Sequence, residues 1–217
     1  MSELAFFALP VLLVIGVFLF FRHNRRLVED RFRSVAQRCG GSVEPAPWIY
    51  YPRLVVPAGD GDVIHVSGMH GNRNGRRTHT FAWLGSEAYR GRSIEIRRLG
   101  ARVGLLERMG WERASTGDPE FDEVFWLHAD APEQALELLD HDVRRALLAF
   151  DPGLGVRLSV AETTAYRDGR MLLGEMEPRL QVSLRRLPPR IEDIEQLIAA
   201  TKVAHARLSR GTLARSA

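Results

Sequence analysis

The longest hydrophobic pattern in the chain is the run from Leu4 to Phe21, which reads LAFFALPVLLVIGVFLFF. These 18 residues include no charged side chain. As a helix that rises about 1.5 Å per residue, such a run extends roughly 27 Å, close to the ~30 Å hydrocarbon core of a bilayer. A proline such as Pro10 is tolerated in a membrane helix. The pattern therefore predicts a short N-terminus and a transmembrane helix over residues 1–21.

The charges that flank this run predict its orientation and its lipid contacts. No Lys or Arg precedes the run, whereas Arg22, Arg25 and Arg26 follow it. Because basic residues remain on the cytoplasmic side, we expect a single-pass protein of the inner (plasma) membrane, with its N-terminus outside and residues 22–217 in the cytoplasm. Anionic lipid headgroups are expected near the three arginines.

Two other readings of the run fit the sequence less well. A cleaved signal peptide would begin with basic residues and end at a small-residue cleavage site, and neither feature is present. A buried helix of a small soluble domain is rarely apolar without interruption over this length. The lipid bilayer is therefore the expected partner of Leu4 to Phe21.

The rest of the chain divides into three predicted parts. Nothing between Val11 and Cys39 breaks a helix, so the membrane helix is expected to continue as a basic juxtamembrane helix over residues 22–40. The pair Gly40-Gly41 suits the end of that helix. Residues 41–210 then form one cytoplasmic α+β domain, and residues 211–217 form a disordered tail.

The first part of the domain carries a strong hairpin signal at Asn74-Gly75, a favoured type I′ turn. Counting back from this turn predicts three directly opposed pairs: Val66 with Trp83, Gly68 with Phe81, and His70 with His79. The core face of this hairpin would carry Ile64, Val66, Phe81 and Trp83.

Later strands follow from alternating apolar positions. Strands are predicted at Arg92–Arg98, with Ile94 and Ile96 inward, at Phe121–His128, and through Leu180, Val182 and Leu184. A second hairpin is predicted at Asp168-Gly169, with Tyr166 facing Met171 and Thr164 facing Leu173.

Two helices complete the prediction. One runs from Pro132 to about Phe150 with Asp130 as its cap, and the other runs from Ile191 to about Leu208. The last helix has acids in its first turns and bases in its last, as the helix dipole favours. The fold class is therefore α+β: an N-terminal transmembrane helix followed by antiparallel β-hairpins with two main helices.

Composition excludes some classes of site. Lys202 is the single lysine among 30 basic residues, and it follows Thr201. A Walker A loop requires a Gly-Lys pair, so this class of nucleotide site is excluded. Cys39 is the only cysteine, which rules out an intrachain disulfide. The nine arginines of residues 71–108 lack a helix-turn-helix or RNP-type pattern, which argues against nucleic acid.

His70 and His79 are the best candidates for metal ligation, because the predicted register places them directly opposite each other. His65 points to the other face in that register, so the pair has no third ligand. The acidic run of residues 118–130 lacks the spacing of a Ca²⁺ loop. We therefore assign no catalytic, cofactor-binding or metal-ligating residue, and no cofactor, from the sequence.

The segment Gly117–Phe125, which reads GDPEFDEVF, is followed by Asp130-Ala131-Pro132-Glu133 and by the pair Leu138-Leu139. This combination resembles an uncharacterised bacterial membrane-anchored family, a domain of unknown function, in which a GDPxFDxxF strand precedes a helix with a Leu-Leu pair. The resemblance covers about residues 115–185. It implies a bacterial, membrane-tethered domain and brings no established activity.

Three functions remain open from the sequence. The first is a membrane-anchored interaction or regulatory module with an unknown protein partner. The second is a membrane-tethered enzyme, with a metal held through His70 and His79. The third is a binder of anionic lipid or nucleic acid that uses the arginine-rich strands.

Overall fold

The computed structural model describes residues 3–47, 51–70, 78–99, 108, 110, 112–167, 170–187 and 189–215. Residues 3–8, 70, 78, 165–167, 170–173 and 211–215 are described by their backbone alone. Within the described residues the chain forms one eight-stranded antiparallel sheet and five α-helices. The predicted α+β class is confirmed, although five helices replace the two main helices that the sequence indicated.

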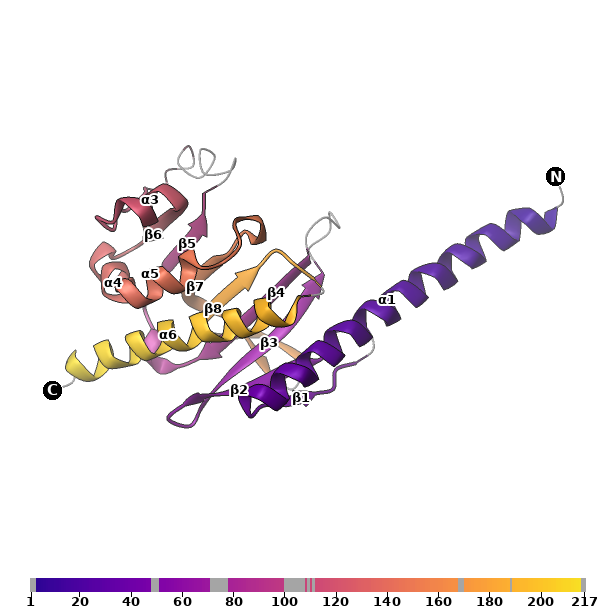
Figure 1. Ribbon diagram of the computed structural model, residues 1–217, viewed down its shortest axis with the longest axis horizontal. Helices are drawn as coiled ribbons and strands as arrows, with labels where there is room; N and C mark the ends of the chain where they lie inside the picture. The colour runs from indigo at the N-terminus through magenta and orange to yellow at the C-terminus, as the bar shows by residue number, and fades with distance from the viewer. Residues whose placement is uncertain are drawn as a thin grey trace.

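Helix α1 (Glu3–Cys39) is one uninterrupted helix through the predicted membrane and juxtamembrane segments (Figure 1). It ends as predicted, because Gly40 adopts a φ of +70° and the Gly41 N–H donates to the Ala36 carbonyl over 2.9 Å. The C-terminal third of α1 lies on the sheet, where Val28, Phe32 and Val35 are fully buried.

The sheet has the strand order β1-β2-β3-β4-β8-β7-β5-β6. Its strands are β1 (Ser42–Glu44), β2 (Arg53–Gly59), β3 (Asp62–His70), β4 (Thr78–Gly85), β5 (Ile94–Arg98), β6 (Phe125–Ala129), β7 (Arg157–Arg167) and β8 (Arg170–Leu184). Every pairing between neighbours is antiparallel. The predicted strand at Arg92–Arg98 is confirmed, with Ile94 and Ile96 buried.

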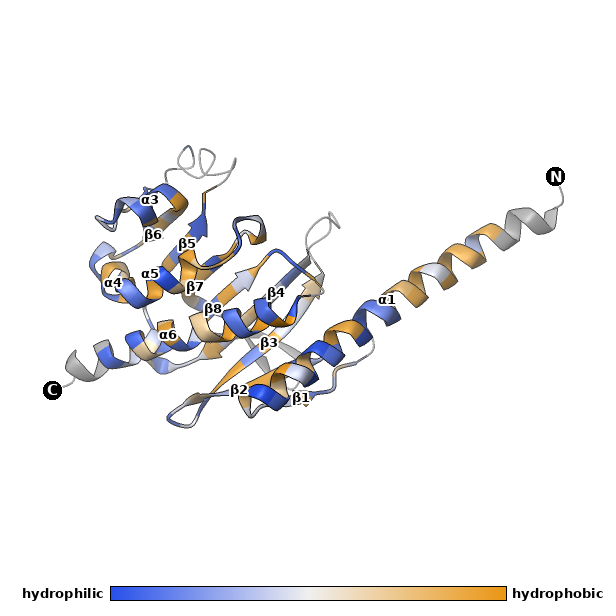
Figure 2. Ribbon diagram, viewed as in Figure 1, coloured by the Kyte–Doolittle hydropathy of each residue, from blue (hydrophilic) through white to orange (hydrophobic). Residues whose placement is uncertain are grey.

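The helices cover one face of this sheet, which carries the apolar core (Figures 1 and 2). They are α1, α3 (Pro119–Val124), α4 (Pro132–Leu138), α5 (His141–Leu148) and α6 (Ile191–Arg215), with short 3₁₀ turns at η1 (Glu87–Tyr89) and η2 (Pro152–Leu154). Core side chains come from alternate positions of the strands, as on Leu180, Val182 and Leu184 of β8, which are buried as predicted.

The predicted register of the β3–β4 hairpin is wrong by one residue. Met69 lies opposite His79, and His70 lies opposite Thr78. A shift of one residue turns one strand's side chains to the other face relative to its partner. The buried face therefore pairs Ile64 and Val66 with Ala82 and Leu84, while Phe81 and Trp83 point to the opposite face. The turn at Asn74-Gly75 lies outside the described residues.

The predicted helix from Pro132 to Phe150 is two helices. Leu139 leaves the helical conformation, and the Asp140 carboxylate restarts it as the cap of α5 by accepting from the Val143 N–H over 3.0 Å. The predicted cap at Asp130 is also wrong, since Ala131 occupies that position without a side-chain bond. The first four residues of the predicted Phe121–His128 strand belong instead to α3 (Pro119–Val124), and β6 begins only at Phe125.

The β7–β8 hairpin follows the prediction at its tip and departs from it below. Tyr166 lies opposite Met171 as predicted, but Thr164 lies opposite Met176 and not Leu173. An irregularity in β8 around Gly174, with a φ of +92°, adds the extra residues. The Asp168-Gly169 turn itself is outside the described part of the chain.

On helix α6, buried side chains recur every three or four residues, the spacing that an amphipathic sequence pattern predicts for a packed helix face. Ile194, Ile198, Thr201, His205 and Leu208 are all buried. The helix continues to Arg215, seven residues beyond its predicted end and into the segment 211–217 for which a disordered tail was expected.

The start of α6 is held by a buried carboxylate. Asp193 is 2% exposed and lies 3.0 Å from Arg186 Nη1 and 3.0 Å from Arg190 Nη2. Burial alone would raise the pKa of Asp193, but the hydrogen bonds from Arg190 and Arg186 outweigh it and lower the pKa. The charged carboxylate therefore stabilises the folded state.

We predict that Asp193→Asn lowers the free energy of unfolding by about 1–3 kcal/mol at pH 7. Because the native pKa of Asp193 is depressed, its contribution is present above the unfolded-state value of about 3.9 and is lost as the pH falls through the lower native value. Urea unfolding of the full chain in neutral detergent should show the gap between wild type and variant closing in acid. Asp142→Asn, at an exposed site in α5, is the matched control and should cost less than about 0.5 kcal/mol. A gap that widens in acid would contradict this account.

Candidate functional site

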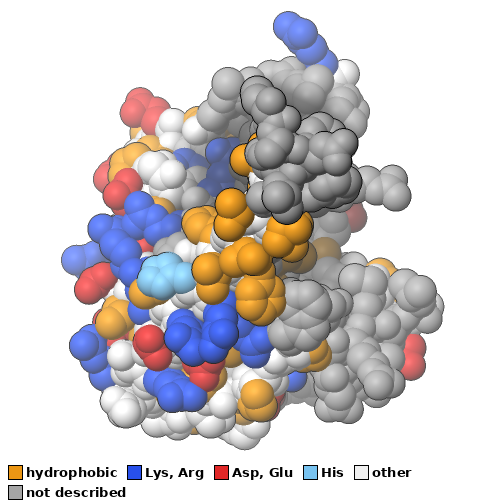
Figure 3. Space-filling model, turned by 90° about the vertical axis from the view of Figure 1, so that its right-hand side faces the viewer, with side chains coloured by type: hydrophobic (Ala, Val, Ile, Leu, Met, Phe, Trp, Pro, Cys, Tyr) orange, Lys and Arg blue, Asp and Glu red, His pale blue; other side chains and the backbone are white. Residues whose placement is uncertain are grey.

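The exposed part of α1 is the most apolar surface in the described structure. Eleven of its apolar side chains are 47–71% exposed: Leu9, Val11, Leu12, Leu13, Val14, Ile15, Val17, Phe18, Leu19, Phe20 and Phe21. Because these positions are almost consecutive, they surround the helix and do not form one stripe. Figure 3, which views the side toward which α1 extends, shows hydrophobic side chains gathered together with Lys and Arg side chains beside them.

A helix that crosses a bilayer must be both long and apolar throughout. Across the described ranges, no helix meets both requirements. The side chains of residues 4–8, which begin the predicted span, lie outside the described residues.

The arginines that follow this stretch divide into two groups. Arg25 Nη2 donates to the Ala46 carbonyl over 2.6 Å, and Arg31 Nη1 donates to the Pro189 carbonyl over 2.6 Å. These two side chains fasten α1 to the domain. Arg22 and Arg26 are exposed, and neither side chain forms a hydrogen bond or an ion pair with another described residue. One turn apart on the helix, Arg22 and Arg26 share a side.

The histidine pair does not form the predicted geometry. His79 lies opposite Met69, so it points to the same face as His65 and Trp83, whereas His70 lies opposite Thr78. The His65 ring lies 5.2 Å from the Trp83 ring, and burial lowers the pKa of His65. Among the described residues there is no group of three side chains suited to a metal, and the side chain of His70 is outside them.

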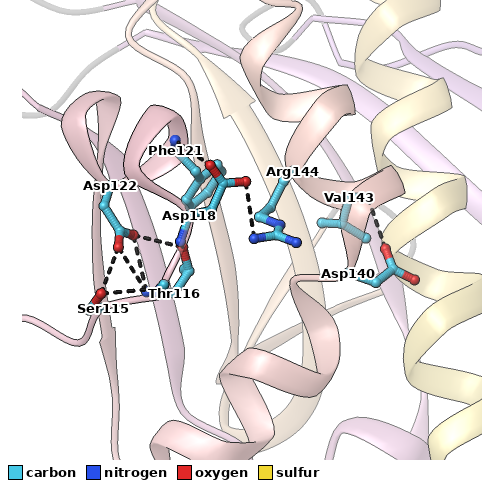
Figure 4. Close-up of polar contacts among 9 residues, drawn as sticks. Ser115, Thr116, Asp118, Phe121, Asp122, Asp140, Val143 and Arg144 are labelled. Carbon is cyan, nitrogen blue, oxygen red and sulfur yellow. Dashed lines mark hydrogen bonds and ion pairs between the residues drawn. The ribbon is translucent and has the colours of Figure 1, made fainter.

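The GDPEFDEVF segment folds around two aspartates (Figure 4). Asp118 caps α3 by accepting from the Phe121 N–H over 3.3 Å, and its other oxygen lies 3.0 Å from Arg144 Nη1. Asp122 accepts from the hydroxyls of Ser115 and Thr116, each over 2.7 Å. Burial opposes the charge of Asp122, but these hydrogen bonds lower its pKa.

These contacts give the segment a structural role. Both aspartates bind groups of their own chain, and Phe121 and Phe125 are buried core residues with ring centroids 4.7 Å apart. The remaining acids of the run, Glu120, Glu123 and Asp130, are exposed and do not join Asp118 and Asp122 in a cluster of three metal ligands.

A buried polar network that the sequence did not indicate joins three elements. The Tyr89 hydroxyl of η1 lies 2.6 Å from His205 Nδ1 of α6, and His205 Nε2 lies 3.2 Å from Asp62 of β3. Tyr89 is fully buried, and burial followed by the nearby Asp62 charge raises its pKa. Residues separated by more than 100 positions supply the network, so no local pattern could have revealed it.

Ser209, His205 and Asp62 have the residue types of a Ser-His-Asp catalytic triad. The Ser209 hydroxyl lies 3.4 Å from His205 Nδ1. The same nitrogen already accepts from Tyr89 at 2.6 Å when Nε2 donates its proton to Asp62. His205 therefore has no free lone pair with which to activate Ser209. The geometry supports a buried structural link and not a nucleophile with its base.

No protein-family model and no curated protein matches this chain. The resemblance of residues 115–185 to a membrane-anchored family therefore stays a prediction.

We predict that Tyr89→Phe lowers the free energy of unfolding by about 1–3 kcal/mol, because it removes the donor that His205 Nδ1 uses inside the core. Ser209→Ala is the matched control and should cost well under 1 kcal/mol, since its hydroxyl is the more distant partner. Chemical unfolding of both variants measures the difference. A larger cost for Ser209→Ala than for Tyr89→Phe would show that the serine, and not the tyrosine, holds the histidine.

Proposed function

We propose that this chain is a single-pass protein of the bacterial inner membrane. In this proposal Leu4 to Phe21 is inserted in the bilayer, the N-terminus is outside, and the α+β domain is a cytoplasmic interaction or regulatory module. The observation that carries the proposal is the set of eleven exposed apolar side chains between Leu9 and Phe21.

Water is a poor environment for this part of α1. A helix that is apolar on all sides is normally buried in protein or in lipid. Soluble monomers rarely expose contiguous apolar patches above a few hundred Å². A helix with one apolar stripe can bury that stripe in a groove of a protein. A helix that is apolar on every side is better covered by the lipid chains of a bilayer, which surround it. The sequence continues this character to Leu4, and 18 residues match the thickness of a bilayer.

The division of the arginines supports the same placement. Arg22 and Arg26 follow the apolar stretch and are exposed, so their guanidinium groups are available to anionic lipid headgroups. Arg25, which the sequence grouped with them, is partly buried and is bound to the Ala46 carbonyl. We therefore assign headgroup contact to Arg22 and Arg26, and attachment of the helix to the domain to Arg25.

A metal-dependent enzyme that uses His70 and His79 is not proposed. Such a metal site would need the two histidines directly opposite each other, and the register places Met69 opposite His79. Nucleic acid is likewise not proposed as a partner.

Cysteine labelling tests the orientation. With Cys39 replaced by Ser, we introduce Ser2→Cys or Ser216→Cys in the full chain and treat intact spheroplasts with a membrane-impermeant maleimide. Labelling of position 2 alone is expected. The flank of a membrane helix that is rich in arginine stays in the cytoplasm, which places position 216 inside and position 2 outside. Labelling of position 216 in intact spheroplasts would invert the topology. Recovery of the chain in the soluble fraction as a discrete oligomer would contradict the membrane proposal. It would indicate that a second copy of α1, and not the bilayer, covers the apolar part of this helix.

Lipid analysis tests the arginine assignment. In polymer-bounded nanodiscs, the full chain should enrich anionic over zwitterionic lipid, and Arg22→Gln with Arg26→Gln should reduce that enrichment. Each arginine near the surface contributes about 1 kcal/mol to such attraction. Arg33→Gln is the control, because Arg33 is exposed but is paired with Glu29. Equal loss in the control would show that total charge, and not position, sets the enrichment.

A further inference from the structure

The face of the sheet opposite the helices carries an ordered set of polar and aromatic side chains. The strand register places Phe81, Ser183, Arg157, Arg97 and Trp126 in one row across β4, β8, β7, β5 and β6. The adjacent row on the same strands consists of Trp83, Gln181, Ser159, Glu95 and His128. In the first row Ser183 therefore lies between Phe81 and Arg157, and in the second row Gln181 and Ser159 lie between Trp83 and Glu95.

Two arginines in this set directly oppose each other. Arg157 and Arg97 form a cross-strand pair, an arrangement in which like charges repel. Glu95, 8% exposed, is bound to both: Arg157 Nη2 donates to it over 2.6 Å, and Arg97 Nε also donates to it. One carboxylate holds two guanidinium groups in place and leaves a surplus positive charge.

The folded state alone gives no reason for this surplus. One arginine would neutralise Glu95, and the second adds repulsion to the sheet. Local violations of this kind are expected where a protein binds something. Both arginine side chains remain accessible, at 36% for Arg97 and 44% for Arg157, so a ligand can reach them.

Hydroxyl groups lie directly beside the arginines. Ser183 is opposite Arg157, and Ser159 is opposite Glu95. Ser183 is only 7% exposed, and no side-chain hydrogen bond is formed by Ser183 or Ser159 within the described structure. Directly opposed residues of an antiparallel pair have Cβ atoms about 4.5–5.5 Å apart. The hydroxyls and the guanidinium groups can therefore contact the same chemical group of a bound ligand.

We propose that this face binds a phosphate group, which Arg157 and Arg97 contact from one side and the Ser183 and Ser159 hydroxyls from the other. Guanidinium groups bind phosphate oxygens in a bidentate manner, and hydroxyls supply the further donors that a tetrahedral anion accepts. Glu95 fixes the arginines before the ligand arrives, which lowers the entropy lost on binding. The proposal does not depend on membrane anchoring.

The ligand is either a soluble phosphate ester or the headgroup of a phospholipid. Isothermal titration of the full chain in neutral detergent, with inorganic phosphate, glycerol 3-phosphate and short-chain phosphatidic acid, distinguishes these sources. We expect saturable binding of at least one probe. Preference for phosphatidic acid over glycerol 3-phosphate identifies a lipid, and equal affinity identifies a soluble ligand.

Variants on this one face localise the site. Arg157→Gln should weaken binding about tenfold or more, because it removes a charged hydrogen-bond donor. Ser183→Ala, a small change at a buried site, should weaken binding severalfold and serves if Arg157→Gln does not fold. Arg53→Gln is the control: Arg53 lies on the same face, on β2, but has its own partner in Glu44. Its affinity should equal that of the wild type.

The proposal is overturned if no probe binds the full chain. It is equally overturned if Ser183→Ala and Arg157→Gln bind as tightly as the wild type, or if Arg53→Gln weakens binding as much as they do. In the last case only nonspecific attraction to a basic surface would remain.

Discussion

The fold depends on covering one apolar face of an eight-stranded sheet. Alternate residues of every strand place aliphatic side chains on that face, and no sheet of this kind is stable with such a face in water. Helix α6 covers β3, β4 and β8, while the end of α1 covers β1 and β2. Because Val28, Phe32 and Val35 of α1 belong to the same core as Ile194 and Leu197 of α6, the N-terminal helix is part of the domain and not an appendage to it.

Arginine is used throughout as a connector between distant segments. Arg25 and Arg31 are two examples. In addition, Arg98 donates to the Phe150 carbonyl just after α5, and Arg207 donates to the Glu137 carbonyl in the last turn of α4. A guanidinium group presents several donors in a fixed plane, so it can bind a carbonyl and still contact water or an acid. This property gives a structural use to a composition in which 29 of 30 basic residues are arginine, since only Lys202 is lysine.

The sequence predicted those features that depend on local pattern. The fold class, the end of α1 at Gly40, the buried alternation of β5 and the stripe on α6 each follow from periodicity or from a glycine at a required φ. The β3–β4 register failed because both Ile64/Val66 and Phe81/Trp83 are apolar, so either pairing gives a plausible core face. The strand residues themselves do not choose between them.

Other features were beyond local reasoning for a different reason. Asp140 interrupts a pattern that is apolar at helical spacing on both sides, and only the cap on the Val143 N–H reveals a new helix there. The Tyr89–His205–Asp62 network and the Arg97–Glu95–Arg157 group each combine strands or helices far apart in the chain. Their members have no spacing rule, because the three-dimensional register alone brings them together.

The continuity of α1 has a mechanical consequence. Between Leu9 and Cys39 the described helix has no break, and its only internal proline, Pro10, lies near the far end. A helix without a kink behaves as a stiff lever over this length. Any tilt, rotation or pull applied to its exposed half is therefore delivered to β1 and β2 and to the contact with α6, with no hinge in between to absorb it.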